Sequence, residues 1–292
     1  MKAIADTFPA LGEKVNWFPG HMYRALRLMK ENVDKIDCFL EIRDSRVPIS
    51  SRNQEFDDLC SFHSKKKIII FNKYDLSNQR VMNNLIEKYN RVGIDCFAVS
   101  AKKGTNMKDI ITQIQQRMPA KYDTVGTWLM ICGMPNVGKS TIINQIRQIA
   151  PELHNRRAIN KATATPCTTK SVVGVKFSQK PLAYLVDTPG VMIPNIQDDE
   201  TALKLSLVGC IKDVIPGKEP ILDYLVWILN KQKQQTYQHH YGMKEPAKTG
   251  DELFVHVRDK YNHYNYDTTY DFILDDFRTG KLGRITMDTV DF

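Results

Sequence analysis

Six short apolar stretches with strand-like composition alternate with amphipathic stretches along the first two-thirds of the chain. They lie at residues 38–42, 68–71, 94–99, 128–132, 172–177 and 182–186. Alternating strand-like and helix-like patterns are typical of a parallel sheet with helices on both faces. The last two stretches are joined by residues 178–181 alone, too few for a crossover helix, which favours an antiparallel hairpin. The sequence therefore predicts a six-stranded, mainly parallel α/β sheet.

The strand-like pattern ends after residue 194, and a helical periodicity takes its place. Four amphipathic stretches follow, at residues 201–214, 221–231, 252–264 and 268–277. Glycine and proline separate them, as expected for turns between helices. A chain of 292 residues has room for one large domain and a smaller one. We therefore expect an α/β domain over residues 1–195 and a small all-α domain over residues 196–292.

The sequence Gly-Met-Pro-Asn-Val-Gly-Lys-Ser at residues 133–140 lies between a predicted strand and a predicted helix. In this context the pattern predicts a phosphate-binding loop. Gly133 and Gly138 let backbone N–H groups surround phosphate oxygens beside a helix N-terminus. Lys139 would reach the β- and γ-phosphates, and Ser140 would offer its hydroxyl oxygen to Mg²⁺. The phosphate-binding residues expected here are Asn136, Val137, Gly138, Lys139, Ser140 and Thr141.

A second phosphate-sensing motif, Asp-Thr-Pro-Gly, occupies residues 187–190 at the end of the last predicted strand. Asp187 at this place can hold Mg²⁺ through a water molecule, and the backbone N–H of Gly190 can meet the γ-phosphate. Between the two motifs lies Thr-Pro-Cys-Thr-Thr at residues 165–169, from which one threonine should reach the metal. The spacing favours Thr169, with Thr168 as the alternative.

Two short motifs that can read a guanine base precede the phosphate loop. Asn-Lys-Tyr-Asp at residues 72–75 and Ser-Ala-Lys at residues 100–102 each follow a predicted strand, where α/β sheets bind ligands. Asp75 can accept hydrogen bonds from guanine N1–H and the N2 amine, which adenine does not present together, so the site would select GTP and GDP. Lys73 would lie along the base, Asn72 would join this loop to the phosphate loop, and Ala101 N–H would point at guanine O6. The base-binding residues expected here are Asn72, Lys73, Asp75, Ser100, Ala101 and Lys102.

The order of these motifs is the reverse of the usual one, in which the phosphate loop comes first. Because both sets of motifs lie at one edge of one sheet, joining the old chain ends and cutting elsewhere preserves the site. The order therefore predicts a circularly permuted P-loop GTPase. The chain leaves the sheet soon after Gly190, so a change at the γ-phosphate should reposition the helical domain as a lever. The alternatives are a small-molecule P-loop kinase, which has no use for the guanine motif, and a scaffold with negligible turnover.

The position of the water-orienting glutamine of Ras-type GTPases is occupied by Val191. An aliphatic side chain cannot accept a hydrogen bond from the attacking water, so intrinsic hydrolysis should be slow. Asn136 could compensate by helping to bind K⁺, or it could only stabilise the loop. His21 could position the water, or it could cap or pack the turn before it. With Lys139 and Gly190, these two are the expected catalytic residues.

Charge and cysteine content limit the class of partner and the compartment. Residues 1–195 hold 29 Lys and Arg against 17 Asp and Glu, which favours a phosphate-rich partner, with solubility alone as the alternative. The six cysteines form no C-x-x-C pair, as expected in a reducing compartment. No uninterrupted apolar stretch is long enough to cross a bilayer, and the N-terminal residues are a weak transit peptide by composition.

Together these motifs resemble the YlqF/RbgA type of circularly permuted GTPase. The resemblance extends to Trp-Phe-Pro-Gly-His-Met at residues 17–22 and to Arg-Asp-Ser-Arg at 43–46, which is similar to the family's D-A-R element. Further stretches, at residues 200–207, 223–225, 240–242 and 277–283, resemble the mitochondrial branch, the mitochondrial ribosome-associated GTPases. One departure is Cys167, where the family's switch sequence has glycine.

The resemblance implies GTP hydrolysis coupled to late assembly of the large ribosomal subunit, with contacts to its rRNA and activation by the ribosomal particle. It also implies that the aliphatic residue at 191 is a family trait and that His21 assists hydrolysis. The basic segment over residues 147–180 is then a candidate rRNA surface, with a solvated loop as the alternative. Members of this branch work in the mitochondrial matrix, peripherally on the inner membrane, and we expect a monomer. A bacterial- or cytosolic-type assembly GTPase of the same family is the alternative.

Overall fold

The computed structural model describes residues 26–27, 29–118, 126–149, 174–179, 182–188, 190–191, 196 and 198–289. Three residues to which the sequence assigned candidate roles, His21, Thr168 and Thr169, lie outside this range. So do Cys167 and most of the basic segment over residues 147–180.

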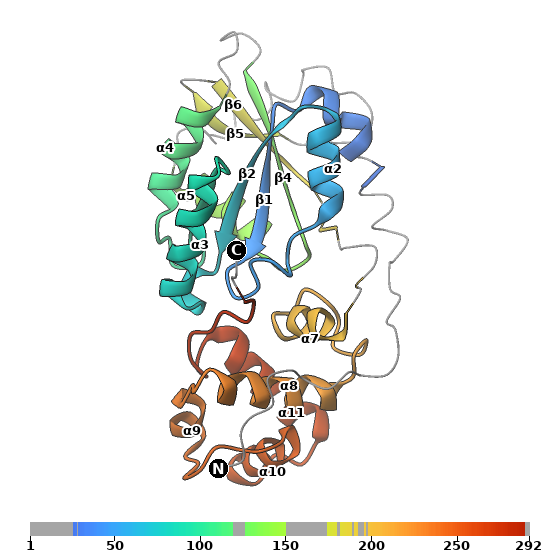
Figure 1. Cartoon of the computed structure of the whole chain (residues 1–292), viewed down its shortest axis with the longest axis vertical. Coiled ribbons are helices and arrows are strands. Elements are labelled where there is room, and N and C mark those ends of the chain that lie inside the picture. Colours follow the sequence, from blue (N-terminus) through green and yellow to red (C-terminus); the bar gives the residue numbers. More distant parts are fainter. Residues whose placement is uncertain are drawn as a thin grey trace.

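Within the described residues, six strands form one sheet in the order β3-β2-β1-β4-β6-β5 (Figure 1). The strands are β1 (Cys38–Asp44), β2 (Lys66–Asn72), β3 (Cys96–Ala98), β4 (Thr127–Gly133), β5 (Gly174–Gln179) and β6 (Leu182–Asp187). Only β5 and β6 pair in the antiparallel sense. The prediction of a six-stranded, mainly parallel sheet is therefore confirmed.

Helices cover both faces of this sheet, as predicted. They are α2 (Gln54–Phe62), α3 (Gln79–Arg91), α4 (Met107–Arg117) and α5 (Lys139–Ile149). Apolar residues of α2 and α3 pack with Phe39 and Ile69 on one face, whereas α4 and α5 pack with Leu40 and Ile68 on the other. Because successive side chains of a strand point to opposite faces, strands covered on both sides are apolar throughout, which explains the continuous apolar runs.

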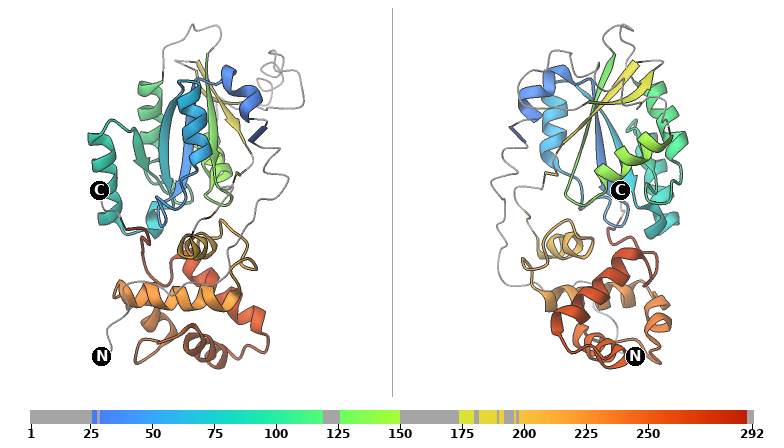
Figure 2. Two further views of the ribbon diagram at one scale, coloured as in Figure 1. Left: turned by 45° about the vertical axis from the view of Figure 1, so that its right-hand side comes forward. Right: turned by 180° about the vertical axis from the view of Figure 1, so that it is seen from behind.

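Residues 199–279 are mostly helical and lie across the carboxyl edge of the sheet (Figures 1 and 2). Their helices are α7 (Asp199–Leu207), α8 (Lys218–Lys231), α9 (Thr236–Tyr241), α10 (Gly250–Tyr261) and α11 (Tyr266–Thr279). The prediction of one helix over residues 201–214 is wrong, because the helix ends at Leu207 and Gly209 adopts a φ of +80°. Helix α9 was not predicted from the sequence.

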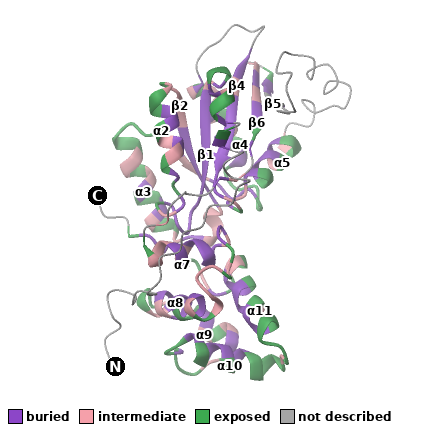
Figure 3. Cartoon of the chain, turned by 90° about the vertical axis from the view of Figure 1, so that its right-hand side faces the viewer, coloured by how far each residue is buried: buried purple, intermediate pink, exposed green. Residues whose placement is uncertain are grey.

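A single cluster of buried apolar residues joins the sheet to these helices. It includes Ile42 and Ile131 of the sheet together with Leu203 of α7 and Leu225 of α8. Figure 3 shows buried residues in the strands and in the facing sides of α7 and α8. The helical part is thus packed against the edge of the sheet where the motifs lie.

After α11 the chain returns to the sheet as a short segment, residues 284–288, which we call the C-terminal strap. Its backbone N–H groups donate from Ile285 to Leu76 O and from Met287 to Arg46 O, at 3.1 and 2.7 Å. The buried Asp288 carboxylate accepts hydrogen bonds from the backbone N–H groups of residues 49 and 50. The helical part is therefore held to the loops after β1 and β2 as well as by its covalent link to β6.

A buried carboxylate organises the helical part. Asp276 of α11 accepts hydrogen bonds from His240 Nε2 at 2.8 Å, Tyr241 Oη at 3.1 Å and Lys281 Nζ at 2.7 Å. Burial alone would raise the pKa of Asp276, but the hydrogen bonds from these three side chains outweigh burial and lower the pKa. The ionised form is therefore the one that stabilises the folded state.

Replacing Asp276 by Asn is expected to lower the free energy of unfolding at pH 7 by about 2 kcal/mol, because charge-assisted hydrogen bonds are lost. A depressed pKa contributes stability above the unfolded value of about 3.9, and that contribution disappears as the pH falls through the folded value. The difference between wild type and variant should therefore shrink below about pH 4. Urea unfolding at pH 7 and pH 3 measures it. The exposed neighbour Asp275→Asn is the control, and equal losses in both variants would contradict the assignment.

Candidate nucleotide site

The phosphate loop connects the end of β4 to the start of α5. Gly133 has a φ of +143°, and a Cβ there would lie 2.4 Å from Ile42 O on the neighbouring strand. Gly138 has a φ of +99°, and a Cβ there would lie 2.2 Å from Asn72 Nδ2. Only glycine fits at either position, so the loop can pass directly beside the guanine motif.

Lys139 opens α5 and folds back over the loop. Its ammonium group donates to Gly133 O at 3.1 Å and to Met134 O at 2.8 Å. Burial lowers the pKa of Lys139. The Lys139 ammonium group is thus held by two loop carbonyl groups beside the N-terminus of α5, a position suited to bind phosphate.

The Asp-Thr-Pro-Gly motif runs alongside this loop. Thr188 Oγ1 donates to Ile131 O at 2.7 Å, and Val191 N donates to Gly133 O at 3.2 Å. A cavity of about 500 Å³ between the two motifs is lined by Pro135, Asn136, Lys139, Ser140, Asp187, Thr188 and Gly190. The structure thus brings together Lys139, Ser140, Asp187 and Gly190, which the sequence assigned to phosphate and metal binding.

The oxygen donors in this cavity can be compared with the ligands that Mg²⁺ prefers in proteins. Ser140 supplies one hydroxyl and Asp187 one carboxylate, and no group of three or more His, Cys, Asp or Glu that could hold a metal ion occurs among the described residues. A pair of hard oxygen donors beside an open space fits an ion that keeps water and phosphate oxygens as its other ligands. Burial raises the pKa of Asp187, against the opposing charge of Lys139.

Asn72 joins the guanine loop to the phosphate loop, as predicted. From the end of β2, its Nδ2 donates to Val137 O at 2.8 Å. Its Oδ1 accepts from Ala101 N at 3.0 Å, which also ties in the Ser-Ala-Lys motif. The expectation that Ala101 N–H points at a base carbonyl is therefore not met in this structure. A buried N–H must have an acceptor, and the nearest one is Asn72 Oδ1.

Asp75, expected to read guanine, is close to the Ser-Ala-Lys motif. Its Oδ2 lies 3.1 Å from Lys103 Nζ, and the Ser100 hydroxyl also bonds to the carboxylate. Burial alone would raise the pKa of Asp75, but Ser100 and Lys103 outweigh burial and lower the pKa. The carboxylate is therefore ionised at neutral pH, as acceptance of two guanine N–H groups requires. Lys103 was not singled out from the sequence, where it is one more lysine after the motif.

Lys73 bridges the guanine and phosphate loops. Its ammonium group donates to Asn136 O at 2.8 Å and lies 2.9 Å from Asp44 Oδ2. Asp44 ends β1 and is completely buried, as is its partner Arg46. The sequence pointed to these two residues only through the D-A-R resemblance.

The guanine and phosphate motifs open into one cavity of about 1400 Å³. From the sheet side it is lined by Asn72, Lys73, Asp75, Ser100, Lys102, Asn136, Gly138, Thr141 and Gly190. The opposite wall comes from the helical part, with residues 208–214, Lys218, Arg278 and Thr279. Asn136 Nδ2 donates to Gly209 O across the cavity, at 2.7 Å. The sequence did not predict this second wall.

The sheet is mainly parallel, with the phosphate loop after β4, the guanine motifs after β2 and β3, and the phosphate-sensing Asp-Thr-Pro-Gly motif after β6. This arrangement defines a circularly permuted P-loop GTPase. Residues 58–197 match the family model described as RsgA GTPase. The chain is 32% identical to Mitochondrial GTPase 1 of Aedes aegypti, over 98% of each chain. It is 33% identical to Mitochondrial ribosome-associated GTPase 1 of Xenopus tropicalis, over 94% of this chain and 95% of the relative.

Bacterial relatives and solved structures agree. The chain is 30% identical to Ribosome biogenesis GTPase A of Priestia megaterium, over 94% of this chain and 96% of that protein. The fold is also that of GNP-bound YlqF from T. maritima, with a TM-score of 0.62, 21% identity, and coverage of 92% and 100%. The chain therefore belongs to the YlqF/RbgA family of circularly permuted GTPases, with the mitochondrial GTPase 1 proteins, and it is a GTPase that binds guanine nucleotides. Among the described residues, no helix has both the length and the apolar character that crossing a membrane requires.

Proposed function

We propose that this GTPase acts in late assembly of the mitochondrial large ribosomal subunit and that the ribosomal particle stimulates its hydrolysis of GTP. The observation that carries the proposal is similarity over nearly the whole chain, helical part included, to proteins named for mitochondrial ribosome association and ribosome biogenesis. The basic surplus of residues 1–195 supports an rRNA contact. A matrix location, peripheral contact with the inner membrane, a monomeric state and a domain boundary after residue 195 belong to the same proposal.

The site residues have distinct roles in this proposal. GTP or GDP is held at its base by Asn72, Lys73, Asp75, Ser100 and Lys102, and at its α- and β-phosphates by Asn136, Val137, Gly138, Lys139, Ser140 and Thr141. Gly190 meets the γ-phosphate of GTP. Ser140, Asp187 and Thr169 hold Mg²⁺, which when bound offsets the negative charge of the β- and γ-phosphates. All of these residues except Val137 and Thr169 line the cavities described above, and Ser140 and Asp187 supply the oxygen donors.

Val191 supports a need for outside stimulation. Its side chain is completely buried among apolar residues, and its carbonyl oxygen accepts from Asn53 Nδ2 at 3.1 Å. Residue 191 therefore offers no side-chain group to orient water. We assign that work to His21, and to K⁺ held near Asn136, whose amide is oriented by Gly209 O. The helical part follows the Asp-Thr-Pro-Gly motif through residues 191–198. It therefore changes position with the bound nucleotide, and the ribosome responds to that position.

Purified mitochondrial large subunits should raise GTP turnover roughly tenfold or more, since a partner that completes a GTPase site can supply much larger factors. The stimulation should be greater in K⁺ than in Na⁺. Co-sedimentation with the subunits should be stronger with a non-hydrolysable GTP analogue than with GDP. Bacterial and cytosolic large subunits serve as the comparison for partner choice. Turnover unaffected by any subunit in either salt would contradict the proposal and favour a scaffold.

A further inference from the structure

Strand β1 and the turn that follows it carry two buried carboxylate–arginine pairs with the same spacing. Glu41 accepts from Arg43 Nε at 3.0 Å and from its Nη2 at 2.8 Å. Asp44 accepts from Arg46 Nε at 3.0 Å and from its Nη2 at 2.8 Å. All four residues are at most 1% exposed. Because the two pairs have the same spacing and burial, each is a control for the other.

Each pair also has a lysine, and the two lysines lie in different places. Glu41 Oε2 lies 3.2 Å from Nζ of Lys67, which is within β2. Asp44 Oδ2 lies 2.9 Å from Nζ of Lys73, which follows β2 in the guanine motif. Of the two lysines, only Lys73 lines the nucleotide cavity. The Asp44 pair is thus built into the site, and the Glu41 pair is not.

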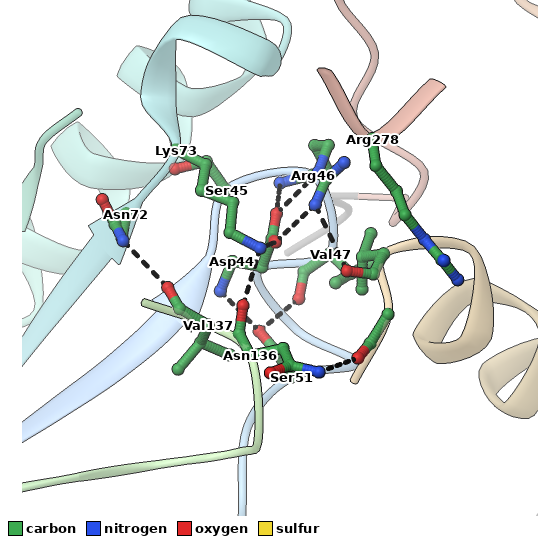
Figure 4. Close-up of polar contacts among 12 residues, drawn as sticks. Asp44, Ser45, Arg46, Val47, Ser51, Asn72, Lys73, Asn136, Val137 and Arg278 are labelled. Carbon is green, nitrogen blue, oxygen red and sulfur yellow. Dashed lines mark hydrogen bonds and ion pairs between the residues drawn. The ribbon is translucent and has the colours of Figure 1, made fainter. Parts of the chain in front are cut away.

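Lys73 is held at both ends. Its backbone is in the left-handed region, with a φ of +61° and a ψ of 33°, which is uncommon for a residue with a Cβ. Its ammonium group is shared between Asp44 Oδ2 and Asn136 O. The aliphatic stem therefore spans the gap between the guanine loop and the phosphate loop at one fixed position (Figure 4).

The Asp44 carboxylate is ionised, as its ion pair with the Lys73 ammonium group requires. Burial alone would raise the pKa of Asp44, but the charges of Arg46 and Lys73 outweigh burial and hold the pKa far below its ordinary value. Arg46 also donates to Val208 O of the helical part at 3.5 Å, and its guanidinium lies 5.6 Å from the centre of the Phe277 ring. Asp44, through Lys73 and Arg46, therefore connects the guanine loop to Val208 and Phe277 of the helical part.

We infer that Asp44 is a positioning residue of the guanine site, which fixes the Lys73 ammonium group so that the lysine stem forms the surface against which the base packs. The inference rests on the proposed placement of guanine at Asp75. Because GDP and GTP carry the same base, the contribution of Asp44 to binding is equal for the two nucleotides. Its action differs from that of the phosphate-sensing motif, which responds to the γ-phosphate alone.

The full-length variant Asp44→Asn tests this, with Glu41→Gln as the matched control. Asparagine keeps one oxygen for Arg46 but removes the charge that holds Lys73, so affinity for GDP and for GTP should each fall roughly tenfold. Glu41→Gln removes an equally buried charge and should leave both affinities within about twofold. Titrations with fluorescent GDP and a GTP analogue measure this. Equal affinity losses in the two variants would overturn the inference, as would a loss confined to GTP.

A double-mutant cycle with Lys73→Met separates positioning from general loosening of the fold. If Asp44 acts through Lys73, adding Asp44→Asn to Lys73→Met should weaken GDP binding by less than about twofold, whereas a full second loss would show independent action and overturn the inference. Should Asp44→Asn be too unstable alone, the GDP dependence of its melting temperature still yields the affinity. The variant Asp75→Asn tests a separate assumption, namely that the guanine base lies at Asp75. If it binds GDP as well as wild type, the placement of guanine is wrong, whatever Asp44 does.

Discussion

Replacing Asp75 by Asn will weaken the binding of GDP and GTP by roughly a hundredfold or more and shift the preference toward xanthosine nucleotides. Guanine presents two donors, N1–H and the N2 amine, to the ionised carboxylate. An asparagine side chain offers one acceptor and one NH₂ donor, so that NH₂ would oppose the guanine amine. Xanthine carries a carbonyl oxygen in place of that amine and therefore matches asparagine. Competition of GDP and XDP against a fluorescent guanine nucleotide measures both effects.

Lys103→Ala is the control for this prediction. Lys103 Nζ lies 3.1 Å from Asp75 Oδ2, yet 59% of its side chain is exposed. Exposed ion pairs contribute little, so this variant should bind GDP within about threefold of wild type. Preserved GDP affinity in Asp75→Asn, with no gain for XDP, would show that the base is read elsewhere.

The parts of the fold that the sequence predicted are those where local pattern and tertiary environment agree. The central strands are apolar because helices cover both of their faces, and this is visible in the sequence alone. Residues 208–211 misled the prediction of a helix over 201–214, because Val208, Cys210 and Ile211 are buried at helix-like spacing. They belong to the apolar cluster that joins the sheet to the helical part, and the turn at Gly209 directs its carbonyl group to Asn136.

Helix α9 was missed for a different reason. Its six residues, Thr-Tyr-Gln-His-His-Tyr, have weak helix propensity and no side-chain cap at Gln235. Its place depends on tertiary contacts, since Tyr237 and Tyr241 are completely buried. Local sequence does not contain that information.

The residues of the site also fall into two groups, those that local sequence reveals and those that only the folded chain brings together. Contiguous motifs such as residues 133–140 could be recognised because backbone geometry over a few residues creates the chemistry. Lys103 and the wall over residues 208–214 could not, and resemblance alone pointed to Asp44 without giving it a role. These residues reach the site only when β1, the loop after β3 and the segment after α7 meet at one edge of the sheet. The Ala101 amide shows a further limit, since its acceptor is a side chain 29 residues earlier in the chain.

Replacing Gly190 by Ala should separate nucleotide binding from hydrolysis. A Cβ at this position would lie 2.8 Å from Pro135 Cα, 2.9 Å from Pro135 N and 3.1 Å from Lys139 Nζ. The first two contacts are with backbone, which cannot yield as a flexible side chain would. The loop after β6 must therefore move away from the phosphate loop, and the Gly190 N–H can no longer meet the γ-phosphate.

Hydrolysis of GTP in Gly190→Ala should consequently fall by roughly a hundredfold, an effect comparable to removing one preorganised donor from an active site. The GDP affinity should change by less than about threefold, because GDP has no γ-phosphate for this loop to meet. Single-turnover hydrolysis and fluorescent-GDP titration measure the two quantities. Gly93→Ala is the control, since a Cβ there meets nothing within 4 Å. Its positive φ of +78° costs stability at a distant turn, but its hydrolysis rate should equal that of wild type. Wild-type hydrolysis by Gly190→Ala would show that the loop does not contact the γ-phosphate.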